Sequence, residues 1–363
     1  MKVALIGLLE SGKSTLFAGL SGKAITPTGS TTIEEATVAV PDERLDWLAG
    51  YHKPKKITYA TIDCLDLPGL SFVDEHGRAL SRRLISHVRT VDMLVLVVRG
   101  FEEATVPAYR DKVDPAGNLA ELRTELLLSD LELVTTRIEK LEKQISKPAK
   151  IQPHDKAELA LQKKLQETIE SEKPISSAIE TEAEREVIKS LGFLTLKPIV
   201  VAVNVGEDRV GEPPRLLAQS SAGAEVVDSS VPVISICAKL ENELSQLDAD
   251  SKAAFMAEMG IKESEKSKFV RSCYSAMGLI SFLTMVSDEL RAWPIKGGTS
   301  ALEAAGKVHT DIKRGFIRAE TFSFDDLKKL GSEKAVKAAG KIRLEGKDYI
   351  VQDGDVINFR FNV

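Results

Sequence analysis

The chain has 363 residues, a formal net charge of −5 and a hydrophobic content of 43%, values that indicate a folded globular protein of two or three domains. No apolar run approaches 18 residues, so we expect no membrane-spanning helix. The acidic balance argues against a generally basic nucleic-acid-binding protein. The chain is already strand-like at Met1–Val3, so we expect no signal peptide. Because Cys64, Cys237 and Cys273 lack a metal-type spacing, we expect reduced thiols in a cytoplasmic protein.

A glycine-rich loop follows the first apolar run. Residues 7–15 complete the phosphate-binding pattern G-x-x-x-x-G-K-S between the strand-like Val3–Ile6 and the helix-like Leu16–Leu20. In such a loop the backbone amides and the positive end of the helix hold phosphate oxygens. Lys13 would neutralise the β- and γ-phosphate charge during catalysis, and Ser14 would hold Mg²⁺. We therefore predict a nucleotide phosphate site formed by Gly7, Glu10, Ser11, Gly12, Lys13, Ser14 and Thr15.

Several apolar runs predict the strands of an α/β domain with a doubly wound sheet. The runs are Val3–Ile6, Thr58–Leu65, Met93–Val98, Ile199–Val203 and Val231–Ile236. The unbroken run Met93–Val98 is typical of a central parallel strand that is covered on both faces. Ligands of such sheets bind at the carboxyl ends of the strands, where the glycine-rich loop lies.

Two further regions have different patterns. Apolar residues recur mostly every three to five positions across Leu119–Ile145 and Leu161–Ile169, which predicts two long helices in an antiparallel hairpin. The pattern is compatible with a solvated arm and equally with a partner-binding arm. Beyond about residue 280, turn signals and the alternating end Ile357–Val363 predict a small α+β module. We thus expect an NTPase domain at 1–117 and 196–280, a helical coiled-coil insert at 118–195 and a C-terminal domain at 281–363.

Further motifs narrow the chemistry of the nucleotide site. Asp66 and Gly69 end the second strand run, where Asp66 suits an indirect contact to Mg²⁺ and the Gly69 amide suits the γ-phosphate. Thr32 is a candidate switch threonine that binds Mg²⁺. Two later strands end in Asn204-Val205-Gly206-Glu207 and Cys237-Ala238-Lys239, where GTPases carry N-K-x-D and S-A-K. The order of these motifs is typical of a GTPase-type switch domain, whose predicted base-binding residues are Asn204, Val205, Glu207, Cys237 and Ala238.

The base-reading motif is altered. In N-K-x-D the aspartate accepts two hydrogen bonds from guanine, whereas Glu207 is one methylene longer and Val205 lacks the lysine stem that covers the base. A buried polar group left without its partner costs about 1–3 kcal/mol, so such a site should lose its preference for guanine. We therefore predict that ATP binds at least as well as GTP.

Taken together, these motifs identify a family resemblance over essentially the whole chain. The stretches that carry it are 7–15, 32–34, 40–46, 204–207, 291–293, 304–311, 313–320 and 345–363. They resemble the YchF or Obg-like ATPase family. The resemblance implies an ATPase core, a coiled-coil insert and a C-terminal ubiquitin-like TGS domain, and it makes Thr32 an expected Mg²⁺ ligand. Family members are associated with ribosomes and with translation or stress regulation.

The chain departs from the family pattern where hydrolysis would take place. Leu70 stands where Ras-like enzymes carry the glutamine that orients water, and a hydrophobic residue is normal for the family at this position. Family members use a histidine on a later loop, and that position corresponds to Ala108 in this chain. Tyr109 is adjacent, but a phenol with a pKa near 10 is a poor base at neutral pH. His76 and His87 are alternatives for the missing histidine, although each reads more simply as a surface residue.

Two other substitutions alter the phosphate end of the site. Glu10 replaces an asparagine that helps family members to hold a monovalent cation, which is therefore a second candidate cofactor beside Mg²⁺. A carboxylate near a triphosphate is repelled unless a cation lies between them, although the side chain could also turn outward. The glycine-rich switch after Asp66 is replaced by Ser71–Gly77, in which Gly77 is the clearest hinge candidate.

These observations leave several functions open. The first is a slow Mg²⁺-dependent ATPase that acts as a ribosome-linked switch. The second is a nucleotide-binding regulatory module with little or no hydrolysis, and the third is an adaptor that binds no nucleotide. Ribosome or ribosomal RNA binding rests on the resemblance, since short basic clusters on an acidic chain are usually solvated surface. We expect a monomer with ATP, or alternatively GTP, as its ligand and no membrane partner.

Overall fold

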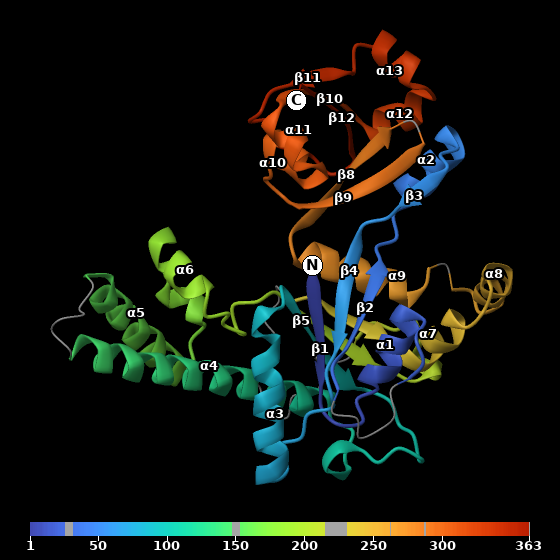
Figure 1. Cartoon of the computed structure of the whole chain (residues 1–363). Coiled ribbons are helices and arrows are strands. Elements are labelled where there is room, and N and C mark those ends of the chain that lie inside the picture. Colours follow the sequence, from blue (N-terminus) through green and yellow to red (C-terminus); the bar gives the residue numbers. More distant parts are fainter. Residues whose placement is uncertain (26–31, 147–152, 215–230, 262, 287, 363) are drawn as a thin grey trace. The chain divides into compact units, whose positions relative to one another are not determined.

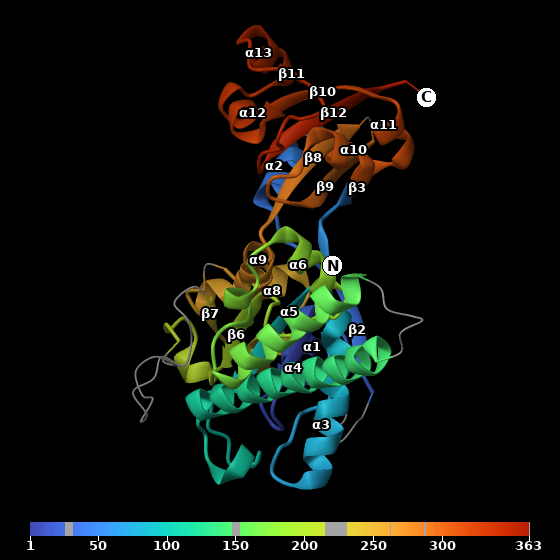
Figure 2. The same ribbon diagram turned by 90° about the vertical axis from the view of Figure 1, so that its left-hand side faces the viewer.

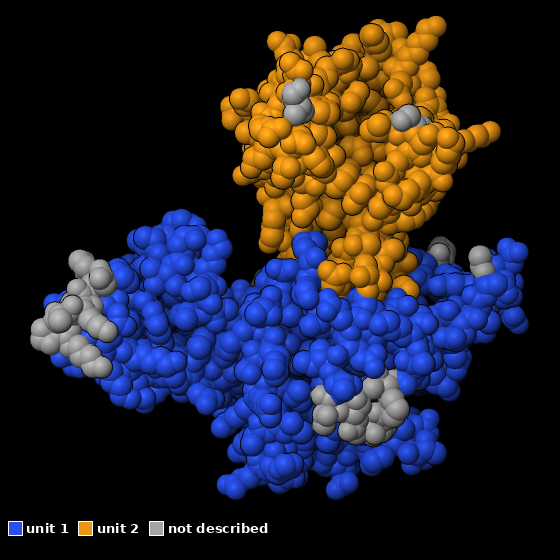
Figure 3. Space-filling view, in the orientation of Figure 1, with its two compact units in different colours: residues 1–36, 64–265 blue, residues 37–63, 266–363 orange. Residues whose placement is uncertain are grey.

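The computed structural model describes residues 1–25, 32–146, 153–214, 231–261, 263–286 and 288–362. The chain forms two compact units (Figure 3). Unit 1 comprises Met1–Ala36 and Cys64–Glu265, and unit 2 comprises Thr37–Asp63 and Lys266–Val363. The second unit thus takes in residues 37–63, which the sequence analysis assigned to the NTPase domain. Among the described helices, none is long and apolar enough to cross a membrane.

Unit 1 is built on a six-stranded sheet with the order β2-β4-β1-β5-β6-β7 (Figure 1). The strands are β1 (Lys2–Gly7), β2 (Glu34–Ala39), β4 (Thr61–Asp66), β5 (Met93–Arg99), β6 (Ile199–Asn204) and β7 (Val233–Ile236). β1, β5, β6 and β7 pair in parallel, with Val3 opposite Met93 and Leu94 opposite Ile199. Every residue of β5 is buried. The predicted α/β fold and its central strand are therefore confirmed.

The predicted strand Thr58–Leu65 is wrong as a single element. The structure divides it into β3 (Lys56–Thr58) and β4, and β3 pairs with a strand of unit 2 rather than with the sheet of unit 1. The alternating pattern of residues 58–65 satisfies both strands, because a half-buried strand has the same period of two in either sheet. Sequence alone does not reveal that the chain changes sheets here.

Helices pack against the sheet of unit 1, and loops at the carboxyl ends of its strands lead into them. They include α1 (Lys13–Ser21), α3 (Glu75–His87), α7 (Ala238–Ser245) and α8 (Ala249–Glu258). α9 (Glu265–Ala276) begins at the last residue of unit 1 and otherwise belongs to unit 2. α1 packs closely on α7, and a Cβ atom on Gly19 would lie 2.8 Å from the backbone nitrogen of Asn242. This close approach of two backbones requires glycine, and it sets the position of α1 directly after the glycine-rich loop.

The insert forms a helical hairpin. α4 (Pro115–Ile145) and α5 (Pro153–Glu170) lie side by side in Figures 1 and 2, and α6 (Glu182–Lys189) follows them. Arg137 binds both oxygens of Glu158, at 2.6 and 2.8 Å, and the Gln144 amide donates to Asp155 at 2.8 Å, so the two helices run in opposite directions. The fully buried Gln162 amide has no hydrogen-bond partner among the described residues.

A buried carboxylate anchors this hairpin. Asp130 of α4 has no exposed surface, and it accepts hydrogen bonds from the guanidinium of Arg89 at 2.7 Å and from the backbone nitrogens of Leu194 and Thr195 at 3.1 and 2.9 Å. These partners lie just before β5 and just before β6. Because the charge is fully paired, it holds the middle of α4 to the segments that precede β5 and β6.

Unit 2 has its own six-stranded sheet with the order β11-β10-β12-β8-β9-β3. Its later strands are β8 (Leu279–Val286), β9 (Glu289–Lys296), β10 (Phe316–Ser323), β11 (Arg343–Glu345) and β12 (Asp355–Phe361). β3 lies at one edge and pairs in parallel with β9, with Ile57 opposite Leu290. The helices are α2 (Glu43–His52), α10 (Ala301–Val308), α11 (Thr310–Arg314), α12 (Phe324–Leu330) and α13 (Glu333–Ala338).

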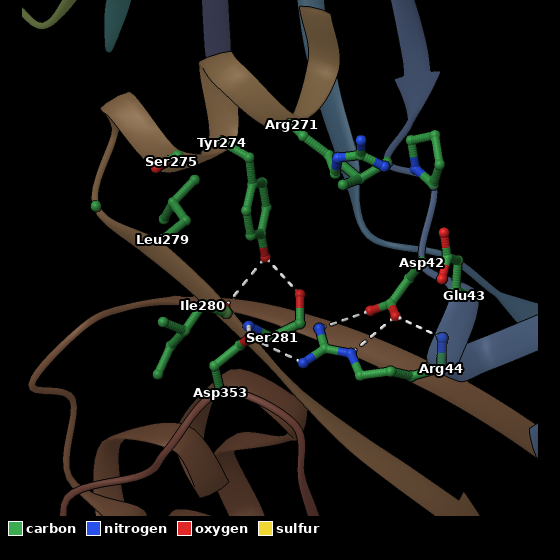
Figure 4. A pocket seen from close by; sticks show the side chains of 13 residues that line it. Asp42, Glu43, Arg44, Arg271, Tyr274, Ser275, Leu279, Ile280, Ser281 and Asp353 are labelled. Atoms are coloured by element: carbon green, nitrogen blue, oxygen red, sulfur yellow. Dashed lines mark hydrogen bonds and ion pairs between the residues drawn. The ribbon is translucent and has the colours of Figure 1, made fainter. Parts of the chain in front are cut away.

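The segment that contains α2 is fastened to unit 2 by side chains. Trp47 contacts Phe324 edge-on, with ring centroids 5.5 Å apart. Arg44 binds both oxygens of Asp42, at 2.8 and 2.9 Å, and reaches Asp353 at 2.8 Å (Figure 4). Asp42, Arg44 and Asp353 line a cavity of about 690 Å³ within unit 2. These aromatic and ionic contacts explain why residues 37–63 belong to unit 2.

Candidate nucleotide-binding site

The predicted phosphate loop joins β1 to α1, as its sequence pattern requires. Gly12 has a φ of 79° and precedes the first residue of α1. Glu10 has a φ of 59°, a left-handed conformation that costs a residue with a Cβ roughly 1–2 kcal/mol. The backbone path of the loop therefore forces strain on Glu10.

Asn204 joins the phosphate loop to the last strand of the sheet. Its Nδ2 atom donates to the Ser11 carbonyl at 3.0 Å, and its Oδ1 atom accepts from the Ala238 backbone nitrogen at 3.0 Å. A Cβ atom on Gly12 would lie 2.0 Å from Asn204 Nδ2, so this approach requires glycine. The structure thus brings together three predicted motifs that are far apart in the chain.

Lys13, Asp66 and Ser14 converge beside the loop. Lys13 Nζ lies 2.6 Å from Asp66 Oδ1 and 3.5 Å from Ser14 Oγ, and both charged side chains are buried. A hydroxyl and a carboxylate are the hard oxygen ligands that suit Mg²⁺, which keeps several waters and binds substrate phosphates as well. The residues present therefore fit Mg²⁺. No group of three or more His, Cys, Asp or Glu that could hold a metal occurs within the described residues.

Thr32, the other predicted Mg²⁺ ligand, lies two residues before β2 and is exposed. Its role as a ligand stays a prediction. The stretch 26–31 directly before it is outside the described residues.

The segment after Asp66 packs against the phosphate loop. A Cβ atom on Gly69 would lie 3.2 Å from the Leu9 Cα atom. The Leu70 nitrogen donates to the Gly7 carbonyl, and the Leu9 nitrogen donates to the Leu70 carbonyl, both at 2.9 Å. The Leu70 side chain is fully buried in the core. It is therefore unable to orient water, which agrees with the expectation from sequence.

Ala108 lies directly before a short 3₁₀ helix (Tyr109–Asp111) on the loop after β5. Tyr109 is buried and its hydroxyl accepts a hydrogen bond from the Phe72 nitrogen at 3.0 Å. His76 and His87 lie on α3, where both are exposed. Their suggested catalytic role stays a prediction.

At the base end, the groups that read guanine in related sites have partners within the protein. Glu207 pairs with Lys239 at 2.7 Å, with both side chains at least half exposed. The Cys237 nitrogen donates to Glu265 Oε2 at 2.6 Å, and the Ala238 nitrogen donates to Asn204 as described above. Val205 is buried. Burial raises the pKa of the Cys237 thiol, which makes it an unreactive structural residue.

Sequence reasoning missed two residues near this site. Glu265 begins α9 and belongs to a charged stretch of the sequence that contains no recognisable motif. Phe101 lies 3.6 Å from the position of a Cβ atom on Gly12, and the Arg99 guanidinium lies 4.4 Å from its ring centroid. An Arg-x-Phe sequence that begins at the last residue of the fully buried strand β5 is a weak signal that could have marked this loop.

Comparisons with known proteins agree with this geometry. A family model described as "50S ribosome-binding GTPase" matches residues 2–204, and a model named YchF-GTPase_C, described as "Protein of unknown function (DUF933)", matches residues 279–362. The chain is 39% identical to "Ribosome-binding ATPase YchF" of Bacillus subtilis, with 100% of both chains covered. It is 38% identical to "Obg-like ATPase 1" of Oryza sativa subsp. japonica, with 100% of this chain and 92% of the relative covered.

A solved structure, "Structure of the Schizosaccharomyces pombe YchF GTPase", superimposes with a TM-score of 0.79 at 30% identity and covers 99% of this chain and 97% of that chain. Relatives of one kind thus match the chain over its full length. The chain belongs to the YchF family of P-loop NTPases.

Proposed function

We propose that this protein binds ATP with Mg²⁺, hydrolyses it slowly and works as a switch on the ribosome. The observation that carries the choice of base is the hydrogen bonding at the carboxyl ends of β6 and β7. The relatives' names, "Ribosome-binding ATPase YchF" and "Obg-like ATPase 1", support the ATPase activity, and the first of them supports the ribosome as partner.

Guanine and adenine demand opposite partners from the protein. Guanine presents an O6 acceptor, whereas adenine presents an N6 donor. Here the backbone donors of Cys237 and Ala238 are already taken by Glu265 and Asn204. A guanine O6 would therefore have to break one of these bonds or stay without a partner, at a cost of about 1–3 kcal/mol. Adenine makes no such demand.

The carboxylate at the base end supports the same choice. An aspartate in N-K-x-D accepts from two guanine nitrogens, but Glu207 is held by Lys239 at 2.7 Å. Reading guanine would first require this ion pair to open. The pair is exposed, so its own strength is small, and the larger part of the argument rests on the two backbone donors.

At the phosphate end, each residue has a defined task. Lys13 would bind the β- and γ-phosphate oxygens in exchange for Asp66, and Ser14 would hold Mg²⁺. The Gly69 amide would donate to the γ-phosphate. Bound Mg²⁺ supplies positive charge that offsets the charge developing on the phosphate oxygens.

Slow turnover is expected because the residues that orient water in other families are absent from the site. Leu70 is buried in the core and Ala108 carries no polar group. The same two observations favour the second candidate function, a binding module with little hydrolysis. The two candidates share the nucleotide site and differ only in the chemical step.

Nucleotide titrations test the base preference. We expect the dissociation constant for ATP to be no higher than that for GTP, and a clear GTP preference would contradict the proposal. A single-turnover assay with excess protein tests hydrolysis, with Lys13→Ala as the control. A rate no faster than this control would leave the binding module as the function.

Ribosome association needs its own experiment. We expect the protein to sediment with ribosomes at low salt and to dissociate as the salt concentration rises, because phosphate contacts release counterions. Failure to sediment at low salt, with and without ATP, would remove the ribosome from the proposal and leave the nucleotide chemistry intact.

A further inference from the structure

The loop after β5 is bonded to the switch segment that follows Asp66. The Tyr109 hydroxyl accepts a hydrogen bond from the Phe72 backbone nitrogen at 3.0 Å. Tyr109 is 7% exposed and Phe72 is 1% exposed, so this contact is shielded from water. A buried amide that lost this partner would have no solvent to replace it.

The loop that carries Tyr109 is held in place both before and after this residue. Arg99, itself buried, donates to the carbonyls of Phe101, Val106 and Pro107 at 3.1, 2.9 and 2.9 Å. The next two residues after Tyr109, Arg110 and Asp111, have φ values of 55° and 57°, in the left-handed region that side-chain-bearing residues rarely adopt. Such conformations persist only where the surroundings enforce them.

A side chain of α4 helps to hold this backbone conformation. Glu121 Oε1 accepts from the Arg110 guanidinium at 2.5 Å and from the Tyr109 hydroxyl at 3.4 Å. The phenol thus donates to Glu121 and accepts from Phe72. Both bonds use the hydroxyl for structure, which leaves it unsuited to act as a general base.

On the other side of the contact, the switch segment is bound to its own surroundings. The Ser71 nitrogen and carbonyl are both bonded to the Ser81 hydroxyl, at 2.9 and 3.0 Å, and the Phe72 carbonyl accepts from Arg78 at 3.0 Å. Leu70 is paired with the phosphate loop as described above. Tyr109 is the partner that ties this segment to the loop after β5.

We propose that Tyr109 is a positioning residue of the nucleotide site, which holds residues 69–72 against the phosphate loop before a nucleotide binds. It acts through Phe72 and Leu70, and so places the Gly69 amide where a γ-phosphate would need a donor. A preorganised donor favours a triphosphate over a diphosphate, because no ordering is required on binding. The proposal rests on the proposed nucleotide function of Gly7–Thr15.

The first test is amide hydrogen exchange at Phe72 in nucleotide-free protein, in the wild type and in Tyr109→Phe, which removes only the hydroxyl. We expect exchange at Phe72 to become at least about tenfold faster, because its buried hydrogen bond is lost. Tyr274→Phe is the matched control, since the Tyr274 hydroxyl bonds to Ser281 at 2.6 Å in unit 2. Unchanged exchange at Phe72 would overturn the proposal.

The second test compares the affinities of a non-hydrolysable ATP analogue and ADP. We expect Tyr109→Phe to lower the ratio of analogue affinity to ADP affinity at least about threefold, whereas Tyr274→Phe leaves the ratio unchanged. An equal loss for both nucleotides would show a merely structural role and overturn the positioning role. Glu121→Gln, which alters the half-buried α4 partner of the Tyr109 hydroxyl, should change the ratio in the same direction by less.

The two tests also separate this proposal from the proposed function. If the wild-type protein binds neither nucleotide, the proposed function fails and the positioning role fails with it. Faster exchange at Phe72 in Tyr109→Phe would even then show that the Tyr109 hydroxyl holds residues 69–72. If the wild type binds both nucleotides but does not hydrolyse ATP, the proposal is still decided by the Phe72 exchange rate and by the ratio of analogue affinity to ADP affinity, because neither measurement requires turnover.

Discussion

The Lys13 ammonium lies 2.6 Å from the Asp66 carboxylate, and the two side chains are 3% and 4% exposed. Lys13→Ala should therefore destabilise the nucleotide-free protein by about 3–5 kcal/mol, because it leaves a buried carboxylate without a cation. The double variant Lys13→Ala with Asp66→Asn should recover a large part of this loss. Urea unfolding followed by circular dichroism measures both.

The exposed pair Lys55 and Asp288 is a matched control, with side chains 80% and 64% exposed. Lys55→Ala should change the free energy of unfolding by less than about 1 kcal/mol. Equal effects of the two lysine substitutions would contradict the importance assigned to burial at Asp66.

The base end makes a second prediction. Val205→Lys with Glu207→Asp restores the N-K-x-D side chains, and should raise the affinity for GTP relative to ATP by about 5- to 150-fold, equivalent to about 1–3 kcal/mol. Titration of both nucleotides measures the ratio. Lys239→Ala alone releases Glu207 but supplies no aspartate, so it should leave the ratio close to that of the wild type.

The hydrogen bonds of Asp114 predict an effect of pH on the start of α4. Asp114 accepts from the Gly117 nitrogen at 2.9 Å, and this bond, with help from Lys112, lowers the pKa of its carboxyl group. A lowered pKa means that the stabilisation is present above the ordinary value near 4 and is lost as the pH falls through the lowered value. Thermal unfolding from pH 7 to about pH 2 should show this loss in the wild type.

Asp114→Asn is the control for this effect, since an asparagine caps the helix without a titrating charge. The stability of Asp114→Asn relative to that of the wild type should therefore rise as the pH falls. Asp114→Ala should cost about 1 kcal/mol at pH 7, because the cap itself is lost. A constant difference between the wild type and Asp114→Asn across this pH range would contradict the assignment.

Unit 2 depends on Arg44 for the attachment of residues 37–63. Arg44→Met removes charged hydrogen bonds to Asp42 and Asp353 and should destabilise this unit by about 2 kcal/mol. The two tryptophans of the chain, Trp47 and Trp293, both lie in unit 2, so their fluorescence during urea unfolding reports this unit. Arg314→Met, which removes a 72% exposed guanidinium, should have almost no effect.

The buried amide of Gln162 offers a stabilising substitution. Neither amide atom has a partner among the described residues, so Gln162→Leu should stabilise the hairpin by about 1–3 kcal/mol. Gln144→Leu is the matched control and should destabilise it, because the Gln144 amide donates to the buried Asp155 carboxylate. Hydrogen exchange of α5 amides measures both, and a loss of protection in Gln162→Leu would contradict the prediction.

Local sequence determined the phosphate loop, the order of the nucleotide motifs and the helical hairpin. A phosphate loop depends on glycines at fixed spacing between a strand and a helix, and a helix that packs on one face depends on apolar residues repeated every three to four positions. Both patterns can therefore be recognised in short stretches of sequence. Glu207 and Val205 likewise indicated an altered base-binding site, because they replace the aspartate and the lysine of N-K-x-D.

Only the tertiary structure decided which distant groups share hydrogen bonds. Arg44 and Asp353 are 309 positions apart, Tyr109 and Phe72 are 37 apart, and Cys237 and Glu265 are 28 apart. A single carboxylate or phenol has no periodicity that could reveal its partner. For the same reason, the alternation of residues 58–65 predicted a single strand and could not show that β3 joins a different sheet, since that choice depends on Arg44, Trp47 and the edge of β9.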